Sequence, residues 1–189
     1  MSNNSFLKDT GVILWLTGIS GAGKTTISRH LEHKLQEYDR LVELLDGDVI
    51  RQNLSKELSF SREDRNTNVR RVGYVANLLS RNGVIVIVAL ISPYRSVRDE
   101  LRSTLNNFVE IYVNASLEVC EARDVKGLYA KARSGQIPLF TGIDDPYEVP
   151  LNPNITCYTA EEETVDESTN KIVIWLESMG YLQRPKIRQ

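Results

Sequence analysis

The sequence of 189 residues predicts an α/β fold with a mostly parallel sheet and helices on both faces. Three observations lead to this prediction. Short apolar runs of strand length recur along the chain, segments with helical periodicity separate them, and the first run ends in a glycine-rich turn. Because crossover helices join parallel strands, we expect ligands to bind beyond the carboxyl ends of the strands.

The first half of the chain begins this alternation. The run VILWLT at 12–17 predicts a buried strand, and a helix with one apolar face begins at Lys24. A second strand is expected at 41–46. Ser61 suits the N-cap of a long helix, which should end near Gly83 because glycine permits a left-handed cap.

The second half continues the alternation and ends in a helix. The expected elements are strands at 84–91, 108–114 and 155–159 and helices at 96–105 and 116–124. Thr164 and Glu167 form a capping box before the last helix, and Gly180 ends it.

Residues 125–150 differ in composition from the rest of the chain. Glycines and prolines are mixed there with Lys126, Lys131 and Arg133. A segment of this length is uncommon as a simple connection, so we expect a mobile lid with a function. The chain as a whole, 1–189, has the length of a single domain.

Composition excludes several classes of protein. A net charge of -2 argues against bulk nucleic-acid binding, which requires a basic face. No apolar run approaches the roughly 20 residues of a membrane span, and no apolar signal region is evident, so we expect a cytoplasmic protein. Cys120 and Cys157 are too few for a disulfide framework or a zinc site and are expected to be reduced core thiols.

The motif GISGAGKT at 18–25 matches the phosphate-loop pattern G-x-x-x-x-G-K-[ST], after a strand and at the start of a helix. Glycines let the backbone approach phosphate oxygens, and the helix N-terminus adds positive potential. Lys24 is expected to reach the β- and γ-phosphates of ATP, and the Thr25 hydroxyl to coordinate Mg²⁺. The expected nucleotide-binding residues are Gly18, Ile19, Ser20, Gly21, Ala22, Gly23, Lys24, Thr25 and Thr26.

Three classes of phosphate-loop protein remain: a small-molecule kinase, a GTP-driven switch and an ATPase engine. The strand at 84–91 ends in ALISPY, without the carboxylate that engines and switches usually place there to hold Mg²⁺. An Asn-Lys-x-Asp segment of the kind guanine-specific switches use is also absent from the sequence. Both observations favour a kinase.

Asp48 is the candidate catalytic base. It follows the strand at 41–46, at the edge where substrates should bind, so its carboxylate could orient an acceptor hydroxyl and take its proton. The alternative role is a helix N-cap, which both Asp46 and Asp48 suit.

The stretch FSREDRNTNVRR at 60–71 is rich in arginine and indicates an anionic acceptor. The candidate anion-binding arginines are Arg51, Arg65, Arg70 and Arg71. Arg65 and Asn68 share one helical face, and Phe60 could stack on a flat ring. Each arginine could equally lie on a solvated helix face, and Phe60 could pack in the core, but together they indicate a nucleotide-like acceptor.

The sequence resembles the adenylylsulfate kinase family in six segments that occur in one order along the chain. They are GISGAGKT, DGDVIR, FSREDRNTNVRR, ISPYRSVRD, EARDVKGLYAKARSGQI and FTGIDDPYEVP. The resemblance covers about residues 11–181. It implies a phosphate-loop kinase fold with a lid, in which MgATP phosphorylates the ribose 3′-hydroxyl of adenosine 5′-phosphosulfate during sulfate assimilation. It also implies a homodimer. A kinase of another small hydroxyl acceptor and a non-catalytic nucleotide switch remain the alternatives.

The resemblance assigns further roles to residues. It implies that Asp48 deprotonates the 3′-hydroxyl, that Arg51, Arg65 and Asn68 grip the phosphosulfate, and that Lys126 neutralises charge on the transferring group. The other residues that it implies are Phe60 and Phe140 around the acceptor adenine, Ile91 and Ser92 in the acceptor pocket, and Arg123, Cys157 and Thr159 near the ATP adenine. The family is sometimes described with a phosphoserine at the Ser92 position, but we expect direct in-line transfer.

Overall fold

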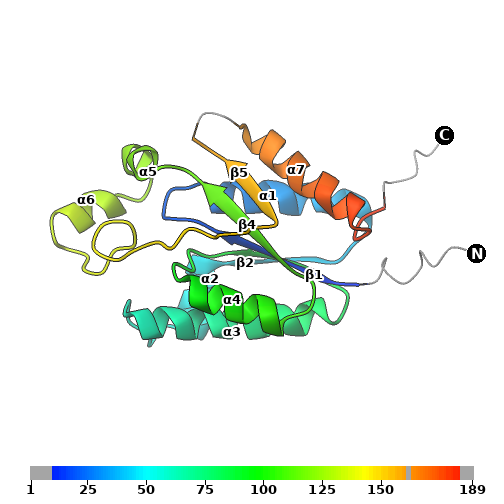
Figure 1. Cartoon of the computed structure of the whole chain (residues 1–189), viewed down its shortest axis with the longest axis horizontal. Coiled ribbons are helices and arrows are strands. Elements are labelled where there is room, and N and C mark those ends of the chain that lie inside the picture. The colour runs from blue at the N-terminus through cyan, green and yellow to red at the C-terminus, as the bar shows by residue number, and fades with distance from the viewer. Residues whose placement is uncertain (1–9, 161–162, 184–189) are drawn as a thin grey trace, which may run out of the picture.

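The structure, a computed structural model, describes residues 10–160 and 163–183, so the ends of the predicted domain lie outside it. One parallel sheet has the strand order β2-β3-β1-β4-β5 (Figure 1). The strands are β1 (Val12–Thr17), β2 (Val42–Asp46), β3 (Ile85–Ala89), β4 (Phe108–Asn114) and β5 (Ile155–Tyr158). The helices are α1 (Lys24–Leu35), η1 (Gln36–Tyr38), α2 (Gly47–Leu54), α3 (Arg62–Ser80), α4 (Arg95–Thr104), α5 (Leu117–Arg123), α6 (Leu128–Arg133) and α7 (Val165–Ser178).

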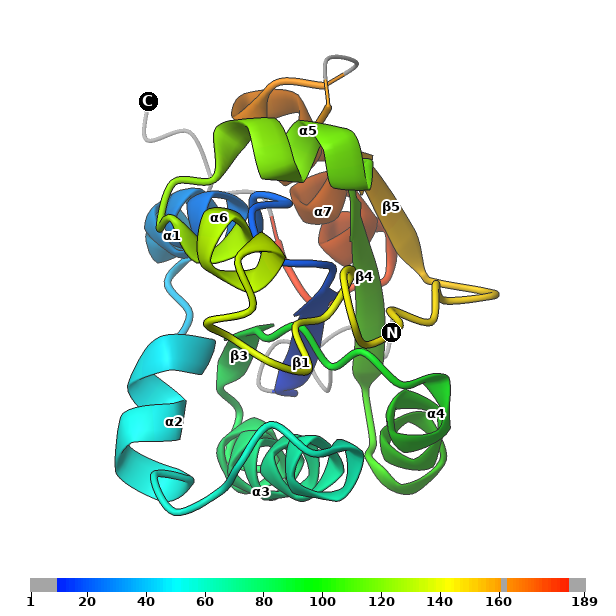
Figure 2. The same ribbon diagram turned by 90° about the vertical axis from the view of Figure 1, so that its left-hand side faces the viewer.

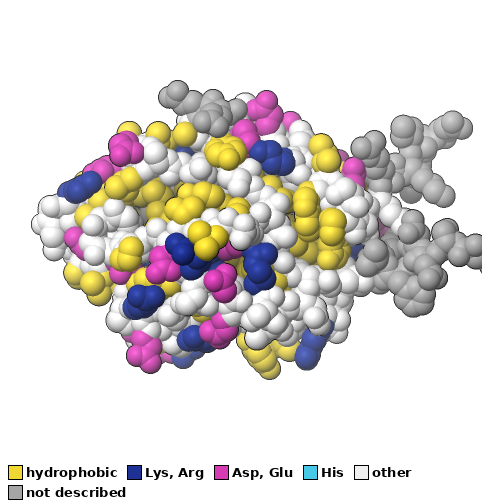
Figure 3. Space-filling model, viewed as in Figure 1, with side chains coloured by type: hydrophobic (Ala, Val, Ile, Leu, Met, Phe, Trp, Pro, Cys, Tyr) yellow, Lys and Arg dark blue, Asp and Glu magenta, His cyan; other side chains and the backbone are white. Residues whose placement is uncertain are grey.

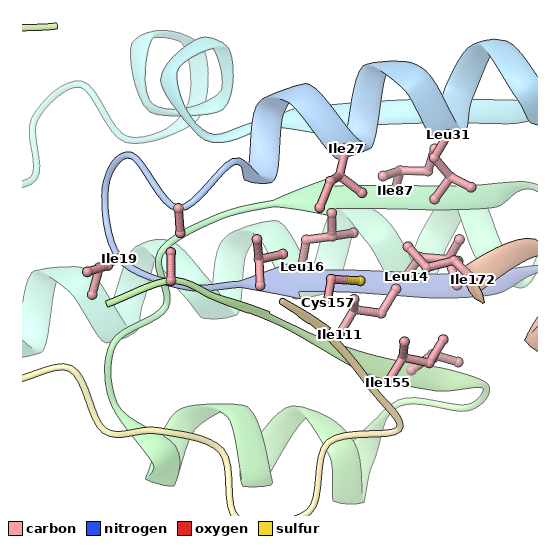
Figure 4. Close-up of a cluster of buried hydrophobic side chains, with 14 of the residues drawn as sticks. Leu14, Leu16, Ile19, Ile27, Leu31, Ile87, Ile111, Ile155, Cys157 and Ile172 are labelled. Carbon is pink, nitrogen blue, oxygen red and sulfur yellow. The ribbon is translucent and has the colours of Figure 1, made fainter. Parts of the chain in front are cut away.

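Helices cover both faces of the sheet, which confirms the predicted fold class. In Figure 1, α1 and α7 lie above the sheet and α3 and α4 lie below it. Every residue of β1 is buried because its alternate side chains enter two separate cores. Leu14 and Leu16 pack toward Ile27 and Leu31 of α1 (Figure 4), whereas Trp15 packs on the side of α3 and α4.

Local sequence signals account for the helix ends. Ser61 accepts a hydrogen bond from the amide of Asp64, and Thr164 forms the predicted capping box with Glu167. The long helix α3 stops shortly before Gly83, which has a φ of 86°. Helices α2 and α6 were not predicted, because eight and six residues are too few for a clear helical period.

The carboxyl ends of the five strands meet at one edge of the molecule, as expected for a parallel sheet. Figure 2 views this edge, with α5 and α6 nearest the viewer and the chain after α6 crossing in front of β1 and β3. The lid predicted at 125–150 therefore contains one short helix and a long return toward α4 and β5. Within residues 10–160 and 163–183, no helix combines the length and apolar character of a membrane span.

Candidate active site

The phosphate loop joins β1 to α1 in a conformation that depends on glycine. Gly21 has a φ of 76° and Gly23 a φ of 101°, both left-handed values that disfavour other residues. A Cβ atom added to Gly21 would lie 3.1 Å from the carbonyl oxygen of Cys120. The helix begins at the next residue after Gly23, so its free amides face the loop and form an anion site.

Lys24 is buried at the base of this loop. Its ammonium donates hydrogen bonds to the carbonyl oxygens of Gly18 and Ile19, each at 2.7 Å. Burial lowers the pKa of Lys24 from 10.5 to about 8, although the carboxylates of Asp48 and Asp46 act in the opposite direction. These two carboxylates therefore lie close enough to Lys24 to influence its charge.

Asp46 is the site residue that sequence analysis missed as a metal candidate. Its Oδ2 accepts a hydrogen bond of 3.3 Å from the hydroxyl of Thr25, and its Oδ1 caps α2 through the amide of Asp48. A carboxylate therefore lies beside Thr25 at the end of β2, the strand next to β3. The signal was present as an aspartate at a strand end, but only the order of the strands brings it to Thr25.

Asp48 and Lys126 form an ion pair across the open edge of the site. Both side chains are more than half exposed, so this pair is accessible to a substrate. The structure therefore brings together the predicted base on α2 and the predicted cation of the lid, which are 78 positions apart in the sequence. Lys126 also lowers the pKa of Lys24, which places it near the phosphate loop.

Two of the four predicted acceptor arginines, Arg51 and Arg65, lie beside Phe60. The Arg51 guanidinium lies 4.1 Å from the centre of the Phe60 ring and that of Arg65 lies 5.3 Å from it. Arg65 donates to the carbonyl oxygens of Phe60 and Leu139 and lies 3.9 Å from Asp145. Arg65 therefore connects the start of α3 to the lid.

Asn68 lies behind Arg65 on α3 and is only 5 % exposed. Its Oδ1 has no hydrogen-bond partner, which is unusual for a buried amide and fits a polar ligand. Phe60 is 48 % exposed, whereas Phe140 is buried and packs edge-on against Tyr129. The side chain of Phe140 thus belongs to the core in this structure.

The other arginines of the stretch have surface partners. Arg70 forms a two-bond ion pair with Glu100, and Arg71 pairs with Glu57. Arg62, on the first turn of α3, lies 4.5 Å from the centre of the Tyr94 ring. These contacts place Arg70 and Arg71 on the outer surface of α3, away from Arg65.

Ser92 and Ile91 follow β3 in a tight turn. The Ser92 side chain is 1 % exposed, and its hydroxyl accepts a hydrogen bond from Trp15 and donates one to Thr17. The carbonyl oxygen of Ile91 accepts from the Thr17 hydroxyl at 2.7 Å. Both residues border the sheet edge next to Asp48, but the Ser92 hydroxyl points inward.

The predicted ATP-adenine residues lie on the opposite side of the phosphate loop. Arg123 donates to the carbonyl oxygens of Gly21 and Thr159, and the Thr159 hydroxyl donates to Ala22 at 2.7 Å. The side chain of Cys157 on β5 is fully buried against α7 (Figure 4), as expected for a core thiol. It points into the core, since alternate residues of a strand face opposite sides.

The phosphate loop, the carboxylate beside it, the lysine that pairs with Asp48 and the two arginines at Phe60 define the class of the protein as a phosphate-loop kinase. The family model for adenylylsulphate kinase matches residues 10–158, and the chain belongs to this family. It is 63% identical over 179 residues to an adenylyl-sulfate kinase of Rippkaea orientalis, covering 95% of this chain and 98% of that one.

Solved structures agree with this assignment. The chain is similar to the Mycobacterium tuberculosis APS kinase solved in complex with AMPPNP and APS, with 40% identity and a TM-score of 0.84. That match covers 89% of this chain and 98% of the other. A hexameric APS kinase from Thiobacillus denitrificans matches with 36% identity and a TM-score of 0.72, over 94% of this chain and 31% of the other.

Proposed function

We propose that the protein is an adenylylsulfate kinase that transfers the ATP γ-phosphoryl group to the ribose 3′-hydroxyl of adenosine 5′-phosphosulfate. The products are ADP and 3′-phosphoadenosine 5′-phosphosulfate, an intermediate of sulfate assimilation. The observation that carries the proposal is the position of Asp48, which pairs with Lys126 and acts electrostatically on Lys24. A base in this position lies between the phosphate loop and the arginine-lined pocket.

The chemistry requires one proton transfer and one exchange of bonds at phosphorus. Asp48 accepts the proton of the 3′-hydroxyl while the 3′-oxygen forms a bond to the γ-phosphorus. At the same time the bond between that phosphorus and the bridging oxygen of ADP breaks. Lys24 and Lys126 stabilise the charge on the equatorial oxygens. The negative charge that leaves with ADP stays close to the phosphate-loop amides.

The proposed substrate contacts divide between two pockets. Arg51, Arg65 and Asn68 bind the phosphosulfate, and Phe60 stacks on the acceptor adenine, with Phe140, Ile91 and Ser92 forming the surrounding wall. On the ATP side, Arg123 and Thr159 border the adenine, and Cys157 contributes only through its backbone, because its side chain lies in the core. The unpartnered Oδ1 of Asn68 supports the acceptor pocket.

We propose that residues 125–150 act as a mobile lid that brings Lys126 to the reacting phosphoryl group. The tip of this segment carries two exposed side chains, Val125 at 86% and Lys126, so little packing holds it in place. The lid also carries Leu139, whose carbonyl oxygen accepts from Arg65. An acceptor anion would compete for that guanidinium and couple acceptor binding to the position of the lid.

The test is ATP consumption with adenosine 5′-phosphosulfate as acceptor, followed by identification of both products. Formation of ADP and the 3′-phosphorylated nucleotide in equal amounts is the expected result. Phosphorylation of a nucleoside or sugar acid in preference would assign the protein to another kinase activity. ATP hydrolysis with no phosphorylated acceptor would indicate a nucleotide switch.

Mg²⁺ fits the oxygen ligands beside the phosphate loop. Thr25 and Asp46, whose side-chain oxygens lie 3.3 Å apart, would hold the ion. Bound there, it would supply positive charge that stabilises the transferring phosphoryl group. Among the described residues there is no cluster of three or more acidic, histidine or cysteine side chains that could hold a metal ion.

We expect Asp46→Asn to raise the Mg²⁺ concentration for half-maximal rate about tenfold, because partners of a direct ligand typically contribute this much to metal affinity. Asparagine keeps the N-cap of α2, so the fold should be preserved. Titration of Mg²⁺ at fixed ATP measures the effect. Asp39→Asn, at an exposed position before β2, is the matched control, and equal shifts in both variants would refute the role of Asp46.

The buried position of Lys24 predicts a pH dependence. Burial favours the neutral amine, so in the free enzyme the cation that attracts phosphate prevails only below about pH 8. We expect kcat/KM for ATP, which reports the free enzyme, to fall as the pH rises above about 8. Bound phosphates favour the charged amine of Lys24, so kcat should fall only at higher pH than kcat/KM does. If kcat and kcat/KM fell at the same pH, Lys24 would not be the group responsible.

A homodimer and a cytoplasmic location are further proposals. Hydrophobic side chains gather on the face that Figure 3 shows, over β4, β5 and the return of the lid. Val149, Leu151 and Tyr158 are exposed by 47%, 72% and 42%, and exposed apolar side chains of this size support a surface that a second copy covers. Analytical ultracentrifugation would measure the oligomeric state, and cell fractionation would test the location.

A further inference from the structure

We propose that Arg98 is a positioning residue for phosphoryl transfer, although it lies outside both substrate pockets. It joins the Ser92 turn, defined as residues 91–94, to the lid return, defined as residues 145–149. The inference rests on the proposed function, because the Ser92 turn forms the wall of the proposed acceptor pocket. Its basis is a buried guanidinium with three separate partners.

Each nitrogen of the Arg98 guanidinium has an acceptor. Nε donates to Oε1 of Glu110 on β4 at 2.8 Å, Nη1 donates to the carbonyl oxygen of Ser92 at 2.5 Å, and Nη2 donates to that of Glu148 at 2.5 Å. The Arg98 side chain is 1% exposed and that of Glu110 is 5% exposed. One side chain therefore ties together β4, the Ser92 turn and the lid return.

The Ser92 turn needs such support because its backbone is strained. Ser92 has a φ of 42°, in the left-handed region that residues other than glycine rarely occupy. Its hydroxyl is held by Trp15 and Thr17 at 3.0 and 3.1 Å, which fixes the side chain to β1. Arg98 holds the carbonyl oxygen of the same residue, so both ends of the strained residue are restrained.

The lid return packs on the same turn through its own hydrogen bonds. The amide of Glu148 donates to the carbonyl oxygen of Pro93 at 2.8 Å, and Oε2 of Glu148 accepts from the amide of Arg95 at 2.7 Å. The Tyr147 hydroxyl lies 2.9 Å from the Thr17 hydroxyl. The lid therefore moves about an end that is fixed to the wall of the acceptor pocket.

Arginine is the only side chain that suits this position. Its planar fork presents donors in fixed directions, whereas a lysine ammonium is a compact charge that cannot span all three acceptors. Glu110 faces Arg98 as its carboxylate partner and also accepts a hydrogen bond from Arg102 at 2.5 Å. The geometry of the fork, rather than the charge, is what the acceptor pocket requires.

The experiment compares Arg98→Lys with the parent enzyme in a Trp175→Phe background, where Trp15 is the single fluorescent reporter beside Ser92. We expect KM for adenosine 5′-phosphosulfate to rise and kcat to fall, with kcat/KM reduced about 100-fold, the usual effect of a small misplacement. KM for ATP should stay within about twofold, because the phosphate loop has separate supports. The Trp15 emission maximum should shift.

Arg102→Lys is the matched control, because Arg102 lies on the same helix and pairs with the same Glu110, whereas its other hydrogen bonds go to Asn152 and Asn154 and not to the Ser92 turn. It should lower Tm without moving the acceptor KM or the emission. Equal effects in both variants, or a loss of Tm alone in Arg98→Lys, would overturn the proposal.

Tyr147→Phe provides a second arm if Arg98→Lys does not fold. It removes only the hydrogen bond to Thr17. The KM for the acceptor should rise about threefold, since one neutral hydrogen bond contributes on this scale. An unchanged acceptor KM in this variant would then refute the proposal. Failure of the parent enzyme to use adenosine 5′-phosphosulfate would refute the proposed function instead, and the Trp15 emission would still test whether Arg98 holds the turn.

Discussion

Replacing Asp48 with alanine is expected to lower kcat about 1000-fold, because a positioned general base contributes about 100- to 10,000-fold. The Kd for ATP should stay within about twofold, since the Asp48 carboxylate pairs with Lys126, which lies outside the phosphate loop. Single-turnover measurement with adenosine 5′-phosphosulfate and a separate ATP-binding titration distinguish the two quantities.

Asp99→Ala is the control for this prediction, because Asp99 is an exposed carboxylate on α4. The Asp48 variant should also fold normally, since its ion pair with Lys126 is largely exposed and such pairs contribute little to stability. Turnover within about tenfold of the parent would remove Asp48 as the base, because the minimum expected contribution is larger. Lost ATP binding would make it a structural residue instead.

Replacing Arg65 with alanine is expected to weaken adenosine 5′-phosphosulfate binding about 100-fold and to leave the Kd for ATP nearly unchanged. Arg65 is mostly buried, and truncation of one partner of a buried charged contact costs about 2–5 kcal/mol, where 1.4 kcal/mol is tenfold. The variant also removes the hydrogen bonds to Phe60 and Leu139, so the acceptor pocket loses shape as well as charge.

Arg70→Ala is the matched control for Arg65→Ala. Both arginines lie on α3, but Arg70 pairs with Glu100 on the outer surface. Calorimetric titration of each variant with acceptor and with ATP measures the two affinities. Equal losses for both ligands in Arg65→Ala, or a similar acceptor loss in Arg70→Ala, would argue against the assigned pocket.

Much of the fold follows from local patterns in the sequence. Alternating apolar runs predicted β1 and β4 with the bounds that the structure has, and capping residues predicted the starts of α3 and α7. Helices α2 and α6 were missed because their periods are too short to detect. The two cysteines lie in the core as expected, although Cys157 was also expected at the ATP site.

The candidate site was predicted unevenly for a physical reason. The phosphate loop is a continuous motif, so its residues and their conformation can be inferred from spacing alone. Asp46 and Arg98 act through partners that are 21 and 50 positions away, and no local pattern reports which strand ends are neighbours. The resemblance implied that Ser92 of the motif ISPY lines the acceptor pocket, and only the structure shows that packing turns its hydroxyl toward Trp15.

The sequence by itself determined the fold class, the phosphate loop and the family, because each depends on residue types at fixed spacing. Only the tertiary structure decided which charges meet. The strand order β2-β3-β1 carries Asp46 to Thr25. The start of the lid brings Lys126 to Asp48, and its return brings Glu148 to Arg98. Such pairings depend on how distant segments pack together. Burial of the two apolar cores fixes this packing, and the separation of two residues along the sequence does not report it.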